Sequence, residues 1–153
     1  MYQIQRYTDE YADELLYFLG NCLPESGRKL DLNGKHKMYL NVSRNFETFW
    51  IMLDGKEVIG TAALKKMDEH CCELKSLYLY KRFQGRGLGR NLLETVIAEA
   101  KRTGYREMYL DTLSTSTRAI TLYEKAGFAI TERYNENRDA DLFMVLEIRA
   151  EKR

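Results

Sequence analysis

The sequence predicts an α/β fold with a mixed central β-sheet flanked by helices, an α/β/α sandwich formed by one domain over residues 1–153. A strand-like run at Cys71–Tyr80 is followed by a long amphipathic helix and a second strand at Glu107–Asp111, and such a crossover makes the two strands parallel. The pair Asp54-Gly55 is a strong two-residue hairpin signal, which adds antiparallel strands. A chain of 153 residues suits one domain with one sizeable core.

The first half of the chain is expected to supply two helices and the antiparallel part of the sheet. A first strand is predicted at Gln3–Tyr7. Apolar residues recur at helical spacing between Asp9 and Asn21, and a second, weaker helical pattern covers Gly34–Ser43. Two strands, Thr48–Leu53 and Lys56–Met67, are then predicted on the two sides of the hairpin signal.

The second half is expected to alternate helices and strands. The helix Gly87–Thr103 has one apolar face, and Gly104 is placed to end it. A further helix, Thr115–Ala126, is closed by Gly127. The last two strands form a hairpin, with predicted ranges Ala129–Tyr134 and Leu142–Ile148.

Composition excludes several classes of partner. The 24 basic residues nearly balance the 23 acidic ones, so neither nucleic acid nor an anionic membrane is an expected partner. No apolar stretch is long enough to span a bilayer, and Met1–Arg6 lacks a signal-peptide core, so we expect a cytoplasmic protein. The three cysteines, Cys22, Cys71 and Cys72, are expected to be reduced thiols, as is usual in that compartment. His36 and His70 complete no metal-ligand spacing, so no metal is expected.

A glycine-rich turn, Gln84–Gly89, joins the strand Cys71–Tyr80 to the long helix. Free backbone N–H groups at a helix start, next to the positive end of the helix dipole, bind anions such as phosphate. Arg86 and Arg90 add positive charge, as do Lys81 and Arg82. The turn lacks the lysine of a P-loop and the third glycine of a dinucleotide fingerprint.

Two motifs in this order resemble those of the GNAT superfamily of N-acetyltransferases. One is Gln-x-x-Gly-x-Gly at Gln84–Gly89, and the other is the helix-ending run Tyr123–Phe128. The resemblance extends from about Phe49 to Ile148, and Glu73–Lys75 and Leu110–Leu113 are similar to a bacterial subgroup whose acceptors are mostly unassigned. It implies an enzyme that transfers an acetyl group from acetyl-CoA, its cosubstrate, to a primary amine by direct attack in a ternary complex.

The resemblance also assigns residues to the cosubstrate. Leu77–Leu79, on the strand Cys71–Tyr80, would bind the pantetheine arm. This strand and its parallel neighbour Glu107–Asp111 would splay apart and admit the cosubstrate between them. The glycine-rich turn would bind the pyrophosphate. Leu79 is expected to stabilise the acetyl carbonyl through its backbone N–H. Ser116 stands where many members carry asparagine, which puts one amide contact in doubt. The assigned residues are Leu77, Tyr78, Leu79, Gln84, Gly85, Arg86, Gly87, Leu88, Gly89, Arg90 and Ser116.

Glu73 is the leading candidate for the general base. An alkylamine has a pKa of about 10.4, so deprotonating it at neutral pH costs roughly 4–5 kcal/mol. At even spacing on a regular strand, Glu73 would face the same side as Leu77 and Leu79. The matching glutamate is the catalytic base in histone-type members. The alternatives are an ordered water, Glu69 or Asp111 as base, or a surface carboxylate paired with Lys75 or Lys66.

Tyr123 is the candidate general acid. The resemblance gives the tyrosine at this position the role of protonating the CoA thiolate, whose thiol pKa is about 8.5. The alternative is that Tyr123 is only a core aromatic on an amphipathic helix.

The acceptor is not specified by the sequence beyond a small-molecule or peptide amine, and acyl-chain preference is equally open. Tyr11, Tyr39 and Trp50 are candidates to line its site, and Tyr134–Asp139 forms either part of that site or a solvated hairpin tip. A homodimer is one possible assembly. The main alternative function is a non-catalytic acyl-CoA-binding module on the same scaffold. A protein that binds ATP or NAD at the turn is opposed by the missing lysine and glycine.

Overall fold

The computed structural model describes residues 1–149, which divide into two compact units. The N-terminal unit comprises Met1–Lys65 and Lys75–Val96, and the C-terminal unit comprises Lys66–Leu74 and the described chain from Ile97 onward. The single domain over residues 1–153 stays a prediction, and residues 150–153 lie outside the described chain.

Three antiparallel strands lie entirely within the N-terminal unit. They are β1 (Tyr2–Arg6), β2 (Thr48–Asp54) and β3 (Glu57–Lys66), with β2 in the middle. Asp54 pairs with Glu57, so the hairpin turn is Gly55-Lys56, one residue later than predicted. Gly55 has φ 64°, a conformation that glycine adopts at no steric cost.

The helix predicted at Asp9–Asn21 begins as a 3-10 turn, and the regular helix α1 covers Ala12–Cys22. Its buried side chains include Leu15, Phe18 and Leu19, so the predicted apolar stripe does pack inward.

A continuous helix over Gly34–Ser43 is wrong. The structure has a 3-10 helix at Lys37–Leu40 and a short helix α2 at Val42–Asn45. Asn41 separates them with extended φ (−146°), and its side-chain oxygen accepts a hydrogen bond from the Arg44 N–H at 3.3 Å. Asparagine competes with helical hydrogen bonding in this way, which favours an N-cap over a helix interior.

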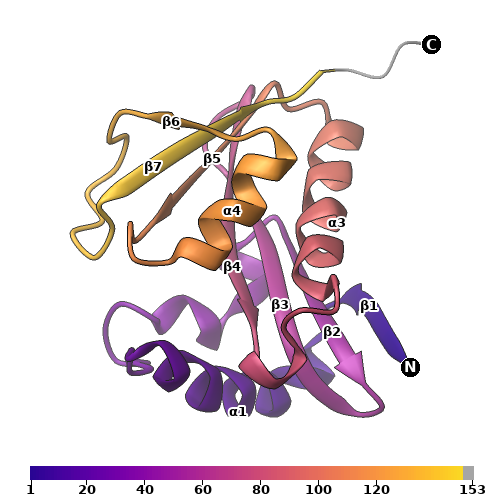
Figure 1. Ribbon diagram of the computed structural model, residues 1–153. Helices are drawn as coiled ribbons and strands as arrows, with labels where there is room; N and C mark the ends of the chain where they lie inside the picture. Colours follow the sequence, from indigo (N-terminus) through magenta and orange to yellow (C-terminus); the bar gives the residue numbers. More distant parts are fainter. Residues whose placement is uncertain (150–153) are drawn as a thin grey trace. The chain divides into compact units, whose positions relative to one another are not determined.

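The C-terminal unit contains the parallel strand pair. The strand β4 (Cys71–Leu79) pairs with β5 (Glu107–Thr112) through Cys71–Glu73, as the crossover through α3 (Leu88–Thr103) predicts. The final hairpin consists of β6 (Ala129–Thr131) and β7 (Leu142–Glu147), and β7 lies between β5 and β6 (Figure 1).

Helix α4 (Thr117–Ala126) precedes this hairpin and ends at Gly127, as predicted. Gly127 has φ 106°, and its N–H bonds back to the Glu124 carbonyl at 3.0 Å.

The seven strands follow the order β1-β2-β3-β4-β5-β7-β6. One parallel pair among antiparallel pairs makes the sheet mixed, and with its flanking helices it confirms the predicted α/β class. No helix within residues 1–149 is both long and apolar enough to cross a bilayer.

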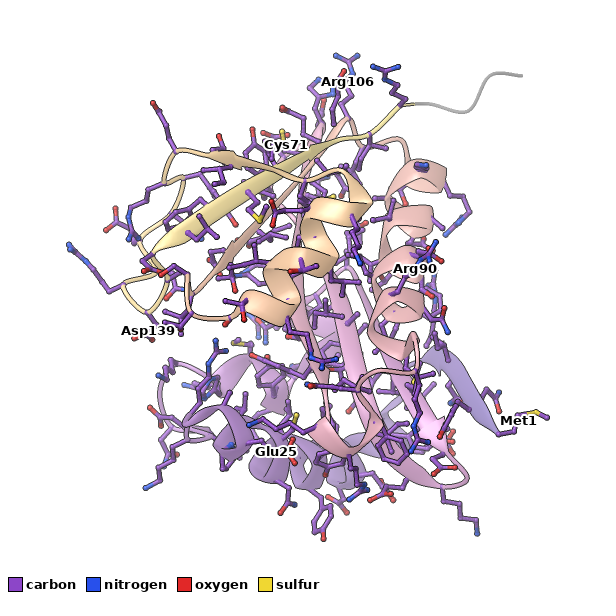
Figure 2. All side chains as sticks on the ribbon, in the orientation of Figure 1. Met1, Glu25, Cys71, Arg90, Arg106 and Asp139 are labelled. Carbon is purple, nitrogen blue, oxygen red and sulfur yellow. The ribbon has the colours of Figure 1, made fainter. Side chains whose placement is uncertain are left out.

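Cys22, Cys71 and Cys72 form no disulfide bond in this structure. Burial raises the pKa of Cys22 to about 12. The pKa of Cys71 is raised to about 11, mainly by removal from solvent and secondly by a hydrogen bond to Glu107. In Figure 2, Cys71 lies near Arg106, whose backbone N–H bonds to the His70 carbonyl at 2.8 Å.

Candidate active site and cofactor-binding turn

The predicted glycine-rich turn lies in the N-terminal unit, directly before α3. Gly85 and Gly87 have φ values of 81° and 78°, in the left-handed region that glycine adopts readily. A Cβ placed on either one meets no atom within 4 Å. The conformation therefore favours glycine, and the space beside the backbone is what a phosphate needs for close approach.

The start of α3 supports the same interpretation. Leu88 is buried and anchors the first turn, and the Asn91 N–H bonds to the Gly87 carbonyl at 3.1 Å. The first turn contains no acidic residue that would neutralise the positive end of the helix dipole. The N–H groups before Asn91 belong to the set that has no partner inside a helix. This end of α3 is electrostatically suited to an anion.

The basic residues of the turn differ in their partners. Arg82 forms an ion pair with Glu57 at 2.8 Å, and Arg90 forms one with Glu94 at 2.8 Å on the outer side of α3 (Figure 2). Arg86 instead donates to the neutral hydroxyl of Tyr2 at 2.5 Å. A neutral partner leaves the positive charge of the guanidinium uncompensated, so Arg86 is better suited to an anion than Arg82 or Arg90.

The part of β4 within the N-terminal unit carries the predicted pantetheine strand. Leu77, Tyr78 and Leu79 are each partly exposed. A Cβ placed on Gly60 would lie 3.1 Å from both the Leu79 side chain and the Tyr78 carbonyl, so only glycine lets β3 approach β4 this closely without a shift.

A backbone irregularity interrupts β4 at Ser76, which has φ 56°. Such a conformation costs a residue other than glycine about 1–3 kcal/mol and is found where surrounding contacts enforce it. Side chains alternate only along an extended backbone. The argument that Glu73 faces the same side as Leu77 and Leu79 therefore fails across Ser76.

In the C-terminal unit, Glu73 is almost completely buried, with 6% of its surface exposed. Its Oε2 atom accepts a hydrogen bond from the Tyr134 hydroxyl at 2.5 Å and another from the Asn135 amide at 3.3 Å. A short O–H···O⁻ contact is a strong, charge-assisted hydrogen bond. The alternative of an exposed strand-surface carboxylate is therefore wrong.

The Asn135 amide connects Glu73 to a second carboxylate. Its nitrogen also donates to Asp111 at 2.6 Å, so one amide group contacts two acidic side chains. Such a bridge brings together two of the base candidates that the sequence suggested.

The tyrosine beside Glu73 is fixed by other aromatic rings. The Tyr134 ring lies 5.0 Å from that of Tyr109 and 5.6 Å from that of Phe143, measured between ring centroids. The pKa of Tyr134 lies far above its usual range, mainly because the side chain is buried and secondly because of its hydrogen bond to Glu73. Tyr134 is therefore a permanent donor to Glu73.

The sequence did not predict the partnership of Tyr134 and Asn135 with Glu73. The separations are 61 and 62 residues, which no short motif spans. The available signal was a polar stretch, Tyr134–Asp139, that begins at the last residue of the predicted strand Ala129–Tyr134. The alternative of a fully solvated hairpin tip does not hold for these two residues, which are both partly buried.

The general-acid candidate, Tyr123, lies on α4 with 6% of its surface exposed, and its ring contacts that of Phe128 edge-to-face at 5.8 Å. Ser116 is the N-cap of α4 but makes no capping hydrogen bond with its side chain.

Two residues expected to line an acceptor site have other environments. Tyr39 is only 4% exposed and packs within an aromatic cluster of the N-terminal unit. Trp50 is half-buried, and the Arg6 guanidinium lies 5.1 Å from the centre of its ring. In the described part of the chain, no three acidic, histidine or cysteine side chains are grouped as a metal site would require.

Sequence relatives are N-acetyltransferases by name. An uncharacterized N-acetyltransferase of Schizosaccharomyces pombe is 42% identical over 132 residues, which cover 82% of this chain and 80% of the relative. An uncharacterized N-acetyltransferase of Bacillus subtilis is 34% identical over 89 residues, or 57% of this chain and 59% of that protein.

Solved structures share the fold. An acetyltransferase of the GNAT family from Staphylococcus aureus matches with a TM-score of 0.88 at 22% identity, over 97% of this chain and 100% of that one. A putative acetyltransferase from Salmonella typhimurium, determined with its cofactor acetyl-CoA, matches with a TM-score of 0.76 at 20% identity, over 100% of this chain and 97% of that one.

The family model described as "Acetyltransferase (GNAT) family" matches residues 8–128, most of the chain. This range includes the glycine-rich turn and the Tyr123–Phe128 run, the two motifs on which the sequence-based prediction depends. The chain belongs to the GNAT family of acetyltransferases.

Proposed function

We propose that this protein transfers the acetyl group of acetyl-CoA directly to a primary amine, with both substrates bound at once. The observation that carries the proposal is the turn before α3, where two glycines with positive φ lead into a helix start without acidic residues. Membership of the GNAT family supports the enzyme class and the cosubstrate. The direct transfer and the residue roles are our proposal.

The N-terminal unit contains the groups proposed to bind the cosubstrate. Backbone N–H groups at Gly87–Gly89 would bind the pyrophosphate, with Arg86 adding positive charge. Leu77–Leu79 would bind the pantetheine arm through their backbone, and the Leu79 N–H would stabilise negative charge on the acetyl oxygen. Acetyl-CoA supplies an activated thioester when it is bound.

Glu73 is proposed to accept the proton of the amine. Its carboxylate is held by Tyr134 and Asn135, so its orientation is fixed before the acceptor arrives. Removing the proton from an alkylamine at neutral pH requires roughly 4–5 kcal/mol, which a positioned base reduces by taking the proton during attack.

Tyr123 is proposed to protonate the departing CoA sulfur. A phenol with a pKa near 10 can donate to a thiolate whose conjugate acid has a pKa of about 8.5 at an uphill cost of roughly 2 kcal/mol. A neutral acid brings no charge into an apolar channel. Because Tyr123 is only 6% exposed, the competing interpretation is a core aromatic, and Tyr123→Phe distinguishes the two by removing only the hydroxyl.

The proposal is tested by a screen for acetyl-CoA-dependent acetylation. The protein is incubated with acetyl-CoA and a panel of primary amines, both small molecules and peptides, and the released CoA thiol and the acetylated product are measured. Transfer to at least one amine, abolished in Gly87→Glu, is the expected outcome. Tight binding of CoA without transfer to any amine would instead favour the non-catalytic acyl-CoA-binding module.

A further inference from the structure

The strained residue of β4 is held at both its side chain and its backbone. Among the residues that the structure describes, Ser76 is the only one other than glycine with positive φ. Its Oγ atom lies 2.6 Å from the Tyr39 hydroxyl, and its carbonyl accepts a hydrogen bond from the Thr61 hydroxyl at 2.6 Å. The two contacts come from segments 37 and 15 residues away, so tertiary structure rather than local sequence enforces the conformation.

Tyr39 is itself rigidly placed. Its ring stacks on His36 and Phe46, with centroids at 6.1 and 5.9 Å, and meets Phe49 edge-on. Burial is the main reason why the pKa of Tyr39 lies well above its usual value, and the neighbouring Tyr78 adds to the increase. The hydroxyl therefore stays protonated at any pH at which an enzyme is assayed.

Thr61 is the second fixed point. It lies in β3 and is fully buried, with 0% of its surface exposed. A buried hydroxyl needs a hydrogen-bond partner, and here the partner is the Ser76 carbonyl. In a regular strand conformation, this carbonyl would point in a different direction. The irregularity at Ser76 therefore satisfies Thr61 as well.

The position of Ser76 gives these contacts a functional meaning. It directly precedes Leu77, the first residue of the segment proposed to bind acetyl-CoA through its backbone. In a strand, successive side chains and N–H groups point in alternate directions. One residue in the left-handed region shifts that alternation for the residues after it, so the conformation of Ser76 determines which way the N–H groups of Leu77–Leu79 point.

We propose that Tyr39 and Thr61 are positioning residues that hold the bend at Ser76 and so direct the backbone of Leu77–Leu79 toward acetyl-CoA. This inference rests on the proposed function, because it assigns a task to the same strand. A serine released from these contacts prefers negative φ, and the strand after it then presents its N–H groups in the wrong register. Neither Tyr39 nor Thr61 needs to touch the cosubstrate.

The test uses variants that remove one contact at a time. Tyr39→Phe removes the hydroxyl and retains the ring, and Ser76→Ala removes its partner while retaining the preference for negative φ. In both, we expect the KM for acetyl-CoA and the Kd for CoA to rise about tenfold, within the range of couplings between contacting residues. Thr61→Val should act in the same direction. The KM of the amine should change little.

Ser76→Gly separates the effect of the backbone bend from the effect of losing the serine hydroxyl. Glycine adopts positive φ freely, so this variant should keep most of the affinity for acetyl-CoA despite losing the Tyr39 contact. In the Ser76→Gly background, Tyr39→Phe should have no further effect. Tyr7→Phe is the matched control, because its ring also packs edge-on against Phe49, at 5.8 Å. It should leave both constants unchanged.

The outcomes are distinguishable. If the wild-type protein binds neither CoA nor acetyl-CoA in calorimetry, the proposed function fails. If the wild type binds CoA but Tyr39→Phe and Ser76→Ala bind it equally well while melting at a lower temperature, the contacts only stabilise the fold and the inference is overturned. Equal losses in Ser76→Gly and Ser76→Ala would also overturn it, because the bend would then not be what matters.

Discussion

The glycine-rich turn of the N-terminal unit and the Glu73 cluster of the C-terminal unit are built by opposite means. The turn depends on backbone conformation, with Gly85 and Gly87 at positive φ and open space beside them. Glu73 depends on side chains from elsewhere in the chain, namely Tyr134 and Asn135. A site built from backbone leaves a local motif in the sequence, whereas the contacts of a site built from distant side chains are not encoded in any short motif.

The comparison has a consequence for substitutions. In the turn, the backbone conformation is essential and most side chains are replaceable, so changes at glycine should have the largest effects. In the Glu73 cluster, single functional groups matter, so isosteric changes that remove one hydroxyl or one charge should be informative. The predictions below follow from this difference, from the largest expected effect to the smallest.

Gly87→Glu should reduce the affinity for CoA by about 100-fold or more, equivalent to roughly 2.7 kcal/mol. The change forces a side chain onto a backbone with φ 78° and places negative charge where the pyrophosphate is proposed to bind. Calorimetric titration with CoA measures the loss.

Gly104→Ala is the control for backbone strain. Gly104 ends α3 at φ 101° with no atom within 4 Å of an added Cβ, so the steric situation matches that of Gly87. It should lower the melting temperature and leave CoA affinity unchanged. Unchanged CoA affinity in a folded Gly87→Glu protein would remove the basis of the proposed cofactor site.

Tyr123→Phe should lower kcat by about 10²-fold, the lower end of what general acid catalysis contributes. The ring and its packing against Phe128 are retained, so the KM for acetyl-CoA should change little. Steady-state kinetics under conditions where chemistry limits the rate measures this. Turnover within about twofold of wild type would show that Tyr123 is only a core aromatic.

Glu73→Gln should lower kcat by a similar factor of about 10². The amide has the shape of the carboxylate but cannot accept the proton, so the decline of the rate at low pH should disappear in the variant. The measurement is the pH dependence of kcat in both proteins. Asp111→Asn is the companion variant, and if it rather than Glu73→Gln removes the low-pH decline, Asp111 is the base. If both variants keep the wild-type profile, an ordered water takes the proton.

Tyr134→Phe should lower kcat by about tenfold, because hydrogen bonds to charged groups contribute about 1.5–3 kcal/mol and the base becomes less well oriented. The Asn135 contact to Glu73 is retained, which limits the loss. Tyr109→Phe is the matched control, since its ring packs on Tyr134 while its hydroxyl contacts Glu107 at 3.4 Å. Equal kcat values for the two variants would contradict a role of Tyr134 in holding Glu73.

Asp141→Asn should cause the smallest effect, a decrease in melting temperature of a few degrees at most. The side chain and backbone of Ser114 donate hydrogen bonds to Asp141, and these lower its pKa from the usual 3.8. A lowered pKa stabilises the fold above the unfolded-state value, and this contribution is lost as pH falls through the folded-state pKa. Melting temperatures should therefore differ between wild type and variant at pH 7, begin to converge below about pH 4, and coincide only below the lowered folded-state pKa of Asp141.

The sequence predicted the parts of the molecule that have local signals. The mixed sheet, the crossover through α3 and the glycine closing α4 are all present, because each depends on periodicity or on one turn residue. The two motifs also predicted the family and the enzyme class, an N-acetyltransferase using acetyl-CoA. The assigned site residues themselves stay predictions.

Other features depend on tertiary contacts and could not be predicted. The helix expected at Gly34–Ser43 is broken because Asn41 caps a new helix rather than continuing the old one. The bend at Ser76 could not be predicted because no glycine marks it in the sequence. It is enforced by contacts with Tyr39 and Thr61, which lie 37 and 15 residues away. Tyr134 is one of 11 tyrosines, and its residue type alone gave no reason to place it against Glu73.

The environments of the three cysteines have a practical consequence for assays. Thiol-reactive dyes detect the thiolate, and a thiol with a pKa of about 11, such as that of Cys71, is ionised in only about one molecule in ten thousand at neutral pH. Cys22 ionises even less, and Cys72 is completely buried, with 0% of its surface exposed. The protein's own thiols should therefore react slowly with such a dye, so CoA released by turnover can be followed continuously above a low background and without blocking or replacing any cysteine.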